Sequence, residues 1–121
     1  MHFTRLVPNV FYKDIRDGLR IFVDCLEFTL GHDEINSSNP FCVVKKDGLA
    51  LNIFQNEEYA LKEHPEFRLE TENIEEIYEK VSVHFPELLH PNLSKITLRP
   101  WGAKEFALMD MQIGIIIQEW P

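Results

Sequence analysis

The stretch RPWGAKEFALMD, Arg99–Asp110, is the most informative part of this chain. It places Pro100 and Gly102 on either side of Trp101 and then enters a run with the character of a strand. Proline fixes φ and glycine adopts conformations closed to other residues, so the pair predicts a rigid corner. A tryptophan beside an arginine on such a corner can present a flat apolar face next to a charge, as in a binding site, or can plug a hairpin as part of the core.

The rest of the chain shows one pattern twice. Apolar residues at helical spacing follow Asp14, and the same design returns after Asn73. Both residues are predicted helix N-caps, and Asn73 with Glu76 approximates a capping box. The predicted apolar faces consist of Ile15, Leu19, Phe22, Val23 and Leu26 in the first helix, and of Ile74, Ile77, Tyr78, Val81 and Phe85 in the second.

Each predicted helix follows one extended segment and precedes three strands. These segments are 6–12, 28–33, 41–45 and 49–55 in the first half, and 67–71, 95–99, 105–109 and 113–120 in the second. The Asp47-Gly48 pair is typical of a tight turn. A polar connector at 56–65, which can form one helical turn at 57–62, separates the halves. The pattern therefore predicts an α+β fold of two tandem β-α-β-β-β modules, 3–55 and 66–120, with curved mixed sheets.

Length, composition and charge limit the classes of function. A chain of 121 residues, 45% hydrophobic and 26% charged, fits one globular domain over 1–121. A net charge of −8 repels phosphate backbones and favours a cationic partner, so we expect no nucleic-acid binding. No signal peptide or membrane span is predicted, and cytoplasm is the default expectation. Cys25 and Cys42 lack metal-binding spacing and are predicted to be free, semi-buried thiols.

The corner and the repeat together resemble the vicinal oxygen chelate superfamily, which includes the glyoxalases, and within it the bleomycin-resistance branch. Arg99–Asp110 is similar to the Pro-x-Gly-x-x-Glu-Phe-x-x-x-Asp stretch of that branch. Further similar segments are Phe22–Phe28, Leu49–Ile53 and Phe67–Ile74. Two departures matter: Glu27 replaces the glycine of a Leu-Gly-Phe motif, and the turn 110–114 is one residue longer. That extra residue leaves open whether Ile117 or Gln118 faces the pocket.

The resemblance also raises the question of a metal, because enzymes of this superfamily hold a divalent ion with His, Glu or Gln on four strands. The matching positions are Val7, Asn52, Glu66 and Gln118, with Asn52 and Gln118 at equivalent places in the last strand of each half. Valine has no donor atom, and amide oxygens are weak ligands beside imidazole or carboxylate. We therefore expect no catalytic metal and no cofactor. A divalent-metal lyase, isomerase or dioxygenase stays as the enzymatic alternative.

Strand alternation predicts one apolar and one mixed sheet face. A merely solvated face would explain this, but Phe11, Phe54, Trp101 and Trp120 on it favour a ligand or second subunit that covers them. The predicted ligand-binding residues are Asn52, Phe54, Glu66, Arg68, Glu70, Arg99, Trp101, Glu105, Gln118 and Trp120. The resemblance implies a homodimer that sequesters a drug-like, cationic or aromatic small molecule without catalysis, as in antibiotic resistance. A structural or regulatory dimer is the other alternative.

Overall fold

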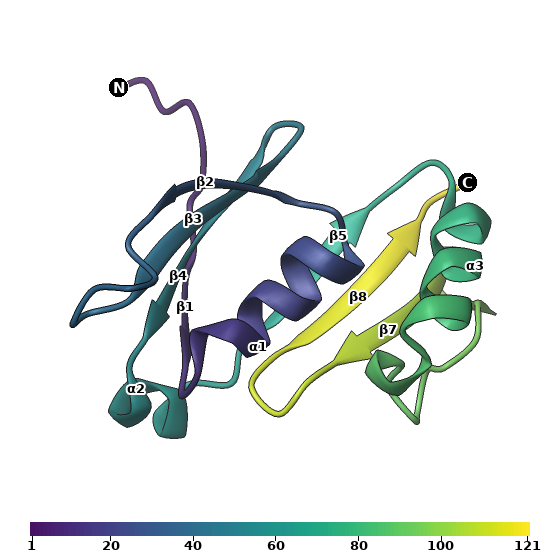
Figure 1. Cartoon of the computed structure of the whole chain (residues 1–121). Coiled ribbons are helices and arrows are strands. Elements are labelled where there is room, and N and C mark those ends of the chain that lie inside the picture. The colour runs from purple at the N-terminus through teal and green to yellow at the C-terminus, as the bar shows by residue number, and fades with distance from the viewer. The chain divides into compact units, whose positions relative to one another are not determined.

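The computed structural model describes all 121 residues and contains two four-stranded mixed sheets, one in each of two units, residues 1–63 and 64–121 (Figure 1). The strand orders are β1-β4-β3-β2 and β5-β8-β7-β6. In each sheet the first and last strands of the module pair in parallel, and the other neighbours are antiparallel. The predicted α+β fold with a repeated β-α-β-β-β pattern is confirmed.

The first unit builds its core between one sheet face and the helix that follows β1. Its elements are β1 (Asn9–Tyr12), α1 (Ile15–Leu19), η1 (Arg20–Cys25), β2 (Thr29–Asp33), β3 (Phe41–Lys46), β4 (Leu49–Gln55) and α2 (Glu57–Lys62). Asp14 caps α1 as predicted, because its side chain accepts a hydrogen bond from Arg16 N. The predicted single helix is an α-helical turn continued by the π-helical η1. It buries Ile15, Ile21 and Phe22.

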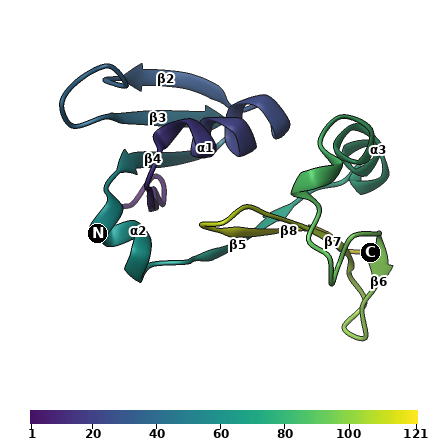
Figure 2. The same ribbon diagram turned by 60° about the horizontal axis from the view of Figure 1, so that its bottom comes forward.

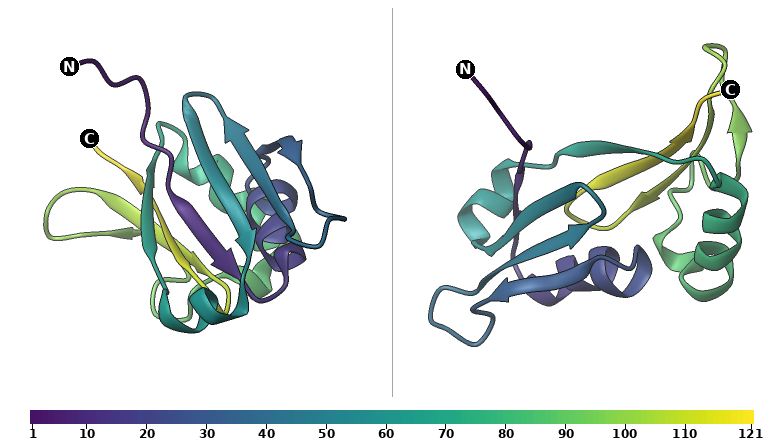
Figure 3. Two further views of the ribbon diagram at one scale, coloured as in Figure 1. Left: turned by 90° about the vertical axis from the view of Figure 1, so that its left-hand side faces the viewer. Right: turned by 90° about the horizontal axis from the view of Figure 1, so that it is seen from above.

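Residues 1–8 precede β1 and form no strand, so the strand predicted from residue 6 begins at Asn9. Figure 3 shows this segment leaving β1 as an extended tail. Phe3 and Leu6 on it are exposed. Only Pro8 joins the sheet, because its carbonyl accepts a hydrogen bond from Asn52 N at 2.9 Å.

Glu27, which stands where the Leu-Gly-Phe motif has glycine, lies just after the end of η1. Glu27 has φ 62°, the left-handed conformation. Phe28 N donates to Phe22 O at 2.9 Å across it and closes the helix end. Glycine adopts this conformation freely, whereas a residue with a Cβ is strained there by roughly 1 kcal/mol. Glu27 therefore keeps the turn at a cost in stability.

The second unit repeats the plan with a longer helix. Its elements are β5 (Glu66–Glu70), α3 (Ile74–His84), η2 (Pro86–Leu88), β6 (Thr97–Leu98), β7 (Lys104–Met109) and β8 (Gly114–Glu119). Helix α3 contacts β7 and β8, and the Tyr78 ring meets Phe106 edge-on at 5.0 Å. The strand predicted at 95–99 shortens to the two residues of β6, which lies at the sheet edge beside β7 (Figure 2).

The predicted capping box at Asn73 is wrong in its main contact. Asn73 Oδ1 accepts from the Thr71 hydroxyl at 2.6 Å, and Asn73 Nδ2 donates to Glu76 at 3.0 Å. The side chain of Asn73 therefore caps no backbone N–H. Glu119, at the end of β8, accepts from Ile74 N at 2.9 Å instead. A tertiary contact that local spacing cannot reveal supplies the cap.

Strand pairing settles the register of β8. Gln118 pairs with Glu105 and shares its face, whereas Ile117 pairs with Phe106 on the face covered by α3. Gln118, not Ile117, is therefore on the polar face.

The expected equivalence of Asn52 and Gln118 is wrong. The two helix caps, Asp14 and Asn73, align the two sheets. Three residues before each cap lie Phe11 and Glu70. The strand partners of Phe11, which are Phe54 and then Phe41, therefore correspond to the partners of Glu70, which are Gln118 and then Glu105. Phe54 thus matches Gln118. One sheet carries aromatic rings where the other carries polar side chains.

Both cysteines are free, as predicted, and they are buried rather than semi-buried. Burial, with a smaller contribution from the charge of Asp33, raises the pKa of the Cys42 thiol to about 11, so it stays protonated near neutral pH. No helix of this chain has the length and apolar character needed to cross a membrane.

Candidate functional site

A buried carboxylate lies on the face of the second sheet opposite α3. The side chain of Glu105, on β7, is 1% exposed. Its Oε2 accepts hydrogen bonds from Trp101 Nε1 at 3.0 Å, Gln118 Nε2 at 2.6 Å and Arg68 Nη1 at 3.1 Å. Burial raises the pKa of this carboxyl. Hydrogen bonds from Trp101 and Gln118 and the charges of Arg68 and Arg99 outweigh that effect and hold the pKa below its usual range. Glu105 is therefore an ionised anchor.

Two half-exposed indoles flank this carboxylate. Trp101 is 48% exposed and Trp120 is 46% exposed. Trp101 donates to Glu105 directly, whereas Trp120 Nε1 donates to Gln118 Oε1 at 3.1 Å, and the Gln118 amide donates to Glu105. The polar edge of each ring thus points into one network while part of its apolar surface stays accessible.

Arg99 completes this group, which we call the Glu105 cluster: Glu105, Arg68, Arg99, Trp101, Gln118 and Trp120. The guanidinium carbon of Arg99 lies 4.8 Å from the ring centroid of Trp101, within cation–π range. Its Nε is buried, 3.7 Å from Glu105 Oε1, and makes no hydrogen bond. Arg99 is therefore held by the ring and by the carboxylate charge.

The predicted corner is confirmed as a tight turn. Gly102 N donates to Arg99 O at 2.9 Å, and Arg99 N donates to Ala103 O at 2.8 Å. Gly102 has φ 98°, which only glycine adopts without strain. The turn presents Trp101 half-exposed, so this ring is not a buried plug.

The remaining predicted residues of the second unit lie on β5. Glu66 and Glu70 alternate with buried-side residues and share the face of Arg68. Both side chains are exposed, and neither carboxylate forms a hydrogen bond or ion pair. The structure therefore joins six of the predicted residues in one cluster and leaves these two carboxylates at the sheet edge.

Asn52 and Phe54 belong to the first unit. Asn52 Nδ2 donates to Asn9 Oδ1 at 3.0 Å. The Phe54 ring stacks between Phe11 at 5.6 Å and Phe41 at 5.8 Å, measured between ring centroids. Phe54 corresponds to Gln118 of the second unit. The two predicted residues of the first unit therefore lie on a separate face, whose rings replace the polar side chains of the cluster.

Sequence reasoning missed the outer members of this aromatic row. Tyr59, on α2, meets Phe11 at 5.0 Å, and His32, on β2, meets Phe41 at 5.5 Å. Phe41 alternates along β3 with the buried Cys42, which places its ring on the less buried face, but only the pairing of β3 with β4 puts it opposite Phe54. No local signal points to Tyr59 or His32.

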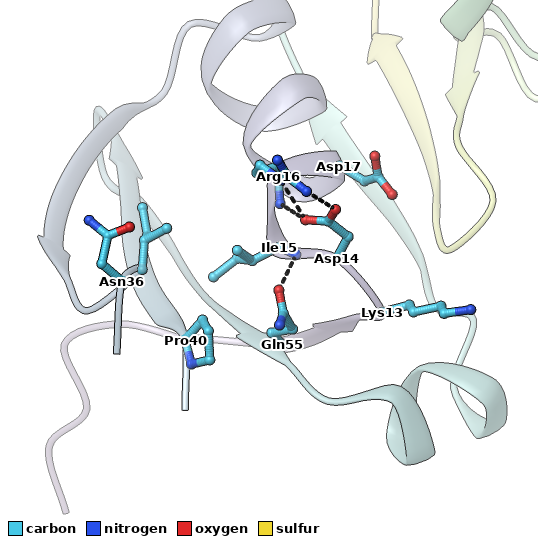
Figure 4. A pocket seen from close by; sticks show the side chains of 9 residues that line it. Lys13, Asp14, Ile15, Arg16, Asp17, Asn36, Pro40 and Gln55 are labelled. Atoms are coloured by element: carbon cyan, nitrogen blue, oxygen red, sulfur yellow. Dashed lines mark hydrogen bonds and ion pairs between the residues drawn. The ribbon is translucent and has the colours of Figure 1, made fainter. Parts of the chain in front are cut away.

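A cavity of about 530 Å³ lies elsewhere in the first unit, between the start of α1 and the segment before β3 (Figure 4). Its polar groups bond to one another: Gln55 Oε1 accepts from Ile15 N at 3.0 Å, and Arg16 pairs with Asp14 at 2.8 Å. None of the predicted ligand-binding residues lines it.

The four positions matched to metal ligands do not fit a divalent ion. Val7 offers no donor atom. The amides of Asn52 and Gln118 are engaged with other side chains, which leaves Glu66 as the one free carboxylate. The structure brings no three His, Cys, Asp or Glu side chains into metal-binding proximity. One carboxylate is too few for a stable site.

Comparison with known proteins bears on the fold. No family model and no curated protein matches the sequence. Among solved structures, a bleomycin-binding protein complexed with bleomycin matches with a TM-score of 0.71 at 19% identity, over 98% of this chain and 100% of that one. TioX from Micromonospora sp. ML1 matches with a TM-score of 0.79 at 11% identity, over 98% and 100%.

A glyoxalase-related enzyme from Clostridium phytofermentans gives a TM-score of 0.73 at 15% identity, over 100% of this chain and 98% of that one. At these identities the likeness concerns architecture. The repeated sheets, the Trp101 corner and these neighbours agree: the chain has the vicinal oxygen chelate fold.

Proposed function

We propose that this protein binds a planar aromatic small molecule at the Glu105 cluster and sequesters it without catalysis. The observation that carries the proposal is the pair of half-exposed tryptophans whose N–H groups are both tied, directly or through Gln118, to one buried carboxylate. The bleomycin-binding neighbour, which is complexed with a small molecule, supports the same class of function.

The network makes both rings suitable for stacking. A ring that is already oriented loses little side-chain freedom when a ligand arrives, so more of the contact energy contributes to affinity. Water can satisfy an indole N–H on an open surface, but here Glu105 and Gln118 bind these groups and direct the apolar ring surfaces outward. Indole rings that only faced water would not need their N–H groups fixed in this way.

We also propose that the protein is a homodimer. The first unit carries half-buried stacked rings on its sheet, and the tail bears exposed Phe3 and Leu6. Apolar surface of this kind is commonly covered by a twofold-related copy. Sedimentation at micromolar concentration tests this: twice the mass of the 14.3 kDa chain is expected, and a monomer would contradict it.

Calorimetric titration with a neutral aromatic probe, 2-naphthalenemethanol, tests the binding proposal. We expect saturable binding that Trp101→Ala weakens by roughly 1–2 kcal/mol, the range for losing one stacking contact. Tyr59→Ala, which removes a half-exposed ring from α2, is the matched control and should leave affinity unchanged. Equal loss in both variants, or no loss in either, would show that the site is not at Trp101.

A further inference from the structure

One face of the Trp101 ring already carries a positive charge. The Arg99 guanidinium lies over the indole at 4.8 Å from its centroid. A ligand that stacks on the opposite face at van der Waals distance places its own charge about 8 Å from this guanidinium. An aromatic cation there faces a like charge across the ring, whereas an aromatic anion faces an opposite one.

Glu105 offsets only one of the two guanidinium charges of the cluster. It is 1% exposed, and its Oε2 already accepts three hydrogen bonds. Two guanidinium groups surround this single carboxylate, which leaves one positive charge in excess within the cluster.

Arg68 adds donors at the same place. Its side chain is 46% exposed, and one of its nitrogens, Nη1, bonds to the same Glu105 oxygen as Trp101 does. The other N–H groups of this guanidinium form no hydrogen bond or ion pair within the protein. A planar guanidinium with free donors beside an aromatic ring is well suited to a carboxylate or sulfonate.

The acidic residues on β5 lie farther from Trp101. Glu70 pairs with Gln118 on β8, which in turn pairs with Glu105 on β7, so Glu70 is two strands away from the carboxylate that Trp101 contacts. Two strand spacings amount to about 10 Å. Glu66 lies toward the opposite end of β5, and both carboxylates are exposed, so salt screens them strongly.

We propose that the Glu105 cluster selects planar aromatic molecules that carry an anionic group, with the ring on Trp101, the anion at Arg68 and the charge of Arg99 acting across the ring. This rests on the proposed function and names the ligand class of the same site. The charge preference is opposite to the one that the net charge of −8 suggests for the whole molecule, because Arg99 lies over the Trp101 ring and Arg68 shares a Glu105 oxygen with it, whereas the side chains of Glu66 and Glu70 contact neither.

Three probes with one ring system test the proposal: naphthalene-2-carboxylate, 2-naphthalenemethanol and 2-naphthylmethylammonium, titrated calorimetrically at pH 7 and 0.15 M salt. We expect the anion to bind about fivefold to tenfold more tightly than the cation, with the neutral probe between them. Arg99→Gln and Arg68→Gln should each reduce this ratio. Lys104→Gln removes the same charge from the α3 side of β7, where Lys104 pairs with Glu75, and should preserve it.

The outcomes separate the two proposals. If the cation binds as tightly as the anion or more tightly, and Trp101→Ala still weakens binding, the charge inference is wrong and the aromatic site stands. If no probe binds, or if Trp101→Ala has no effect on any of them, the proposed function itself fails. The probe series on the unaltered protein decides the charge preference even where an arginine variant does not fold.

Discussion

Replacing Glu105 by glutamine should destabilise the second unit more than any other conservative change at its polar face. The carboxylate is 1% exposed and holds Trp101, Gln118 and Arg68 through one oxygen. Glutamine keeps the shape but removes the charge. Its carbonyl oxygen can take the place of Oε2, but its NH2 group then faces the Arg99 guanidinium, which is itself a donor. The change therefore tests whether this carboxylate organises the cluster.

The size of the effect follows from these contacts. Hydrogen bonds to a charged group contribute about 1.5–3 kcal/mol each, and an unpaired buried partner adds its desolvation cost. The arginine side chains are 46% and 34% exposed, so water can solvate them once the charge is lost. Gln118 is 4% exposed, so water cannot compensate for the weaker hydrogen bond that its amide would make to a neutral acceptor. We expect Glu105→Gln to lower the free energy of unfolding by about 2–4 kcal/mol.

Urea unfolding followed by tryptophan fluorescence measures this loss. The chain has two tryptophans, and both belong to the second unit, so the signal reports that unit. Glu75→Gln is the matched control, because it breaks the exposed pair with Lys104 and should have no measurable effect. If Glu105→Gln unfolds at the wild-type urea concentration, the cluster does not depend on the carboxylate and the reasoning is refuted.

Further predictions concern stability, pH and metal. The stability difference between wild type and Glu105→Gln should be full at neutral pH and should shrink as pH falls below about 4. The reason is that a carboxyl with a depressed pKa stabilises the folded state only while it is ionised. Denaturation curves in which the two proteins differ as much in free energy of unfolding at pH 3 as at pH 7 would oppose this. Glu27→Gly should raise the free energy of unfolding by about 1 kcal/mol by relieving the φ of 62°, whereas Glu27→Ala should not; equal effects would remove the strain argument. Gly18→Ala should destabilise the first unit by about 1–3 kcal/mol, since its Cβ would lie 2.9 Å from the buried Tyr12 ring, and a neutral result in thermal unfolding would be inconsistent with this packing. Protein purified without chelator should contain no stoichiometric divalent metal by elemental analysis; zinc, nickel, manganese or iron bound at Glu66 would revive the enzymatic alternative.

Local patterns in the sequence were enough to predict the architecture. Helical spacing after Asp14 and Asn73 and the alternation of the strands both reflect a one-sided core, which each module needs in order to bury its sheet. The Pro100–Gly102 corner was also predictable, because proline and glycine restrict the backbone themselves. The helix cap supplied by Glu119 was not predictable, since it depends on the distant end of β8.

The candidate site was predictable in its members but not in their roles. The sequence predicts Arg68, Glu105 and Gln118 as ligand-binding residues, yet Glu105 is buried under its own partners. Register decides such roles, and the longer turn before β8 hid it. The same uncertainty paired Asn52 with Gln118, where strand pairing matches Phe54 to Gln118.

The two indole N–H groups allow the most direct measurement of the central claim. The chain has two tryptophans, so a ¹H–¹⁵N spectrum contains two indole signals, which Trp101→Phe and Trp120→Phe assign. Titration with naphthalene-2-carboxylate should shift both signals along one saturating curve, because both groups belong to one hydrogen-bonded network beside the stacked ring. Indole signals that stay in place through a millimolar titration, while the probe binds elsewhere or not at all, would contradict the account.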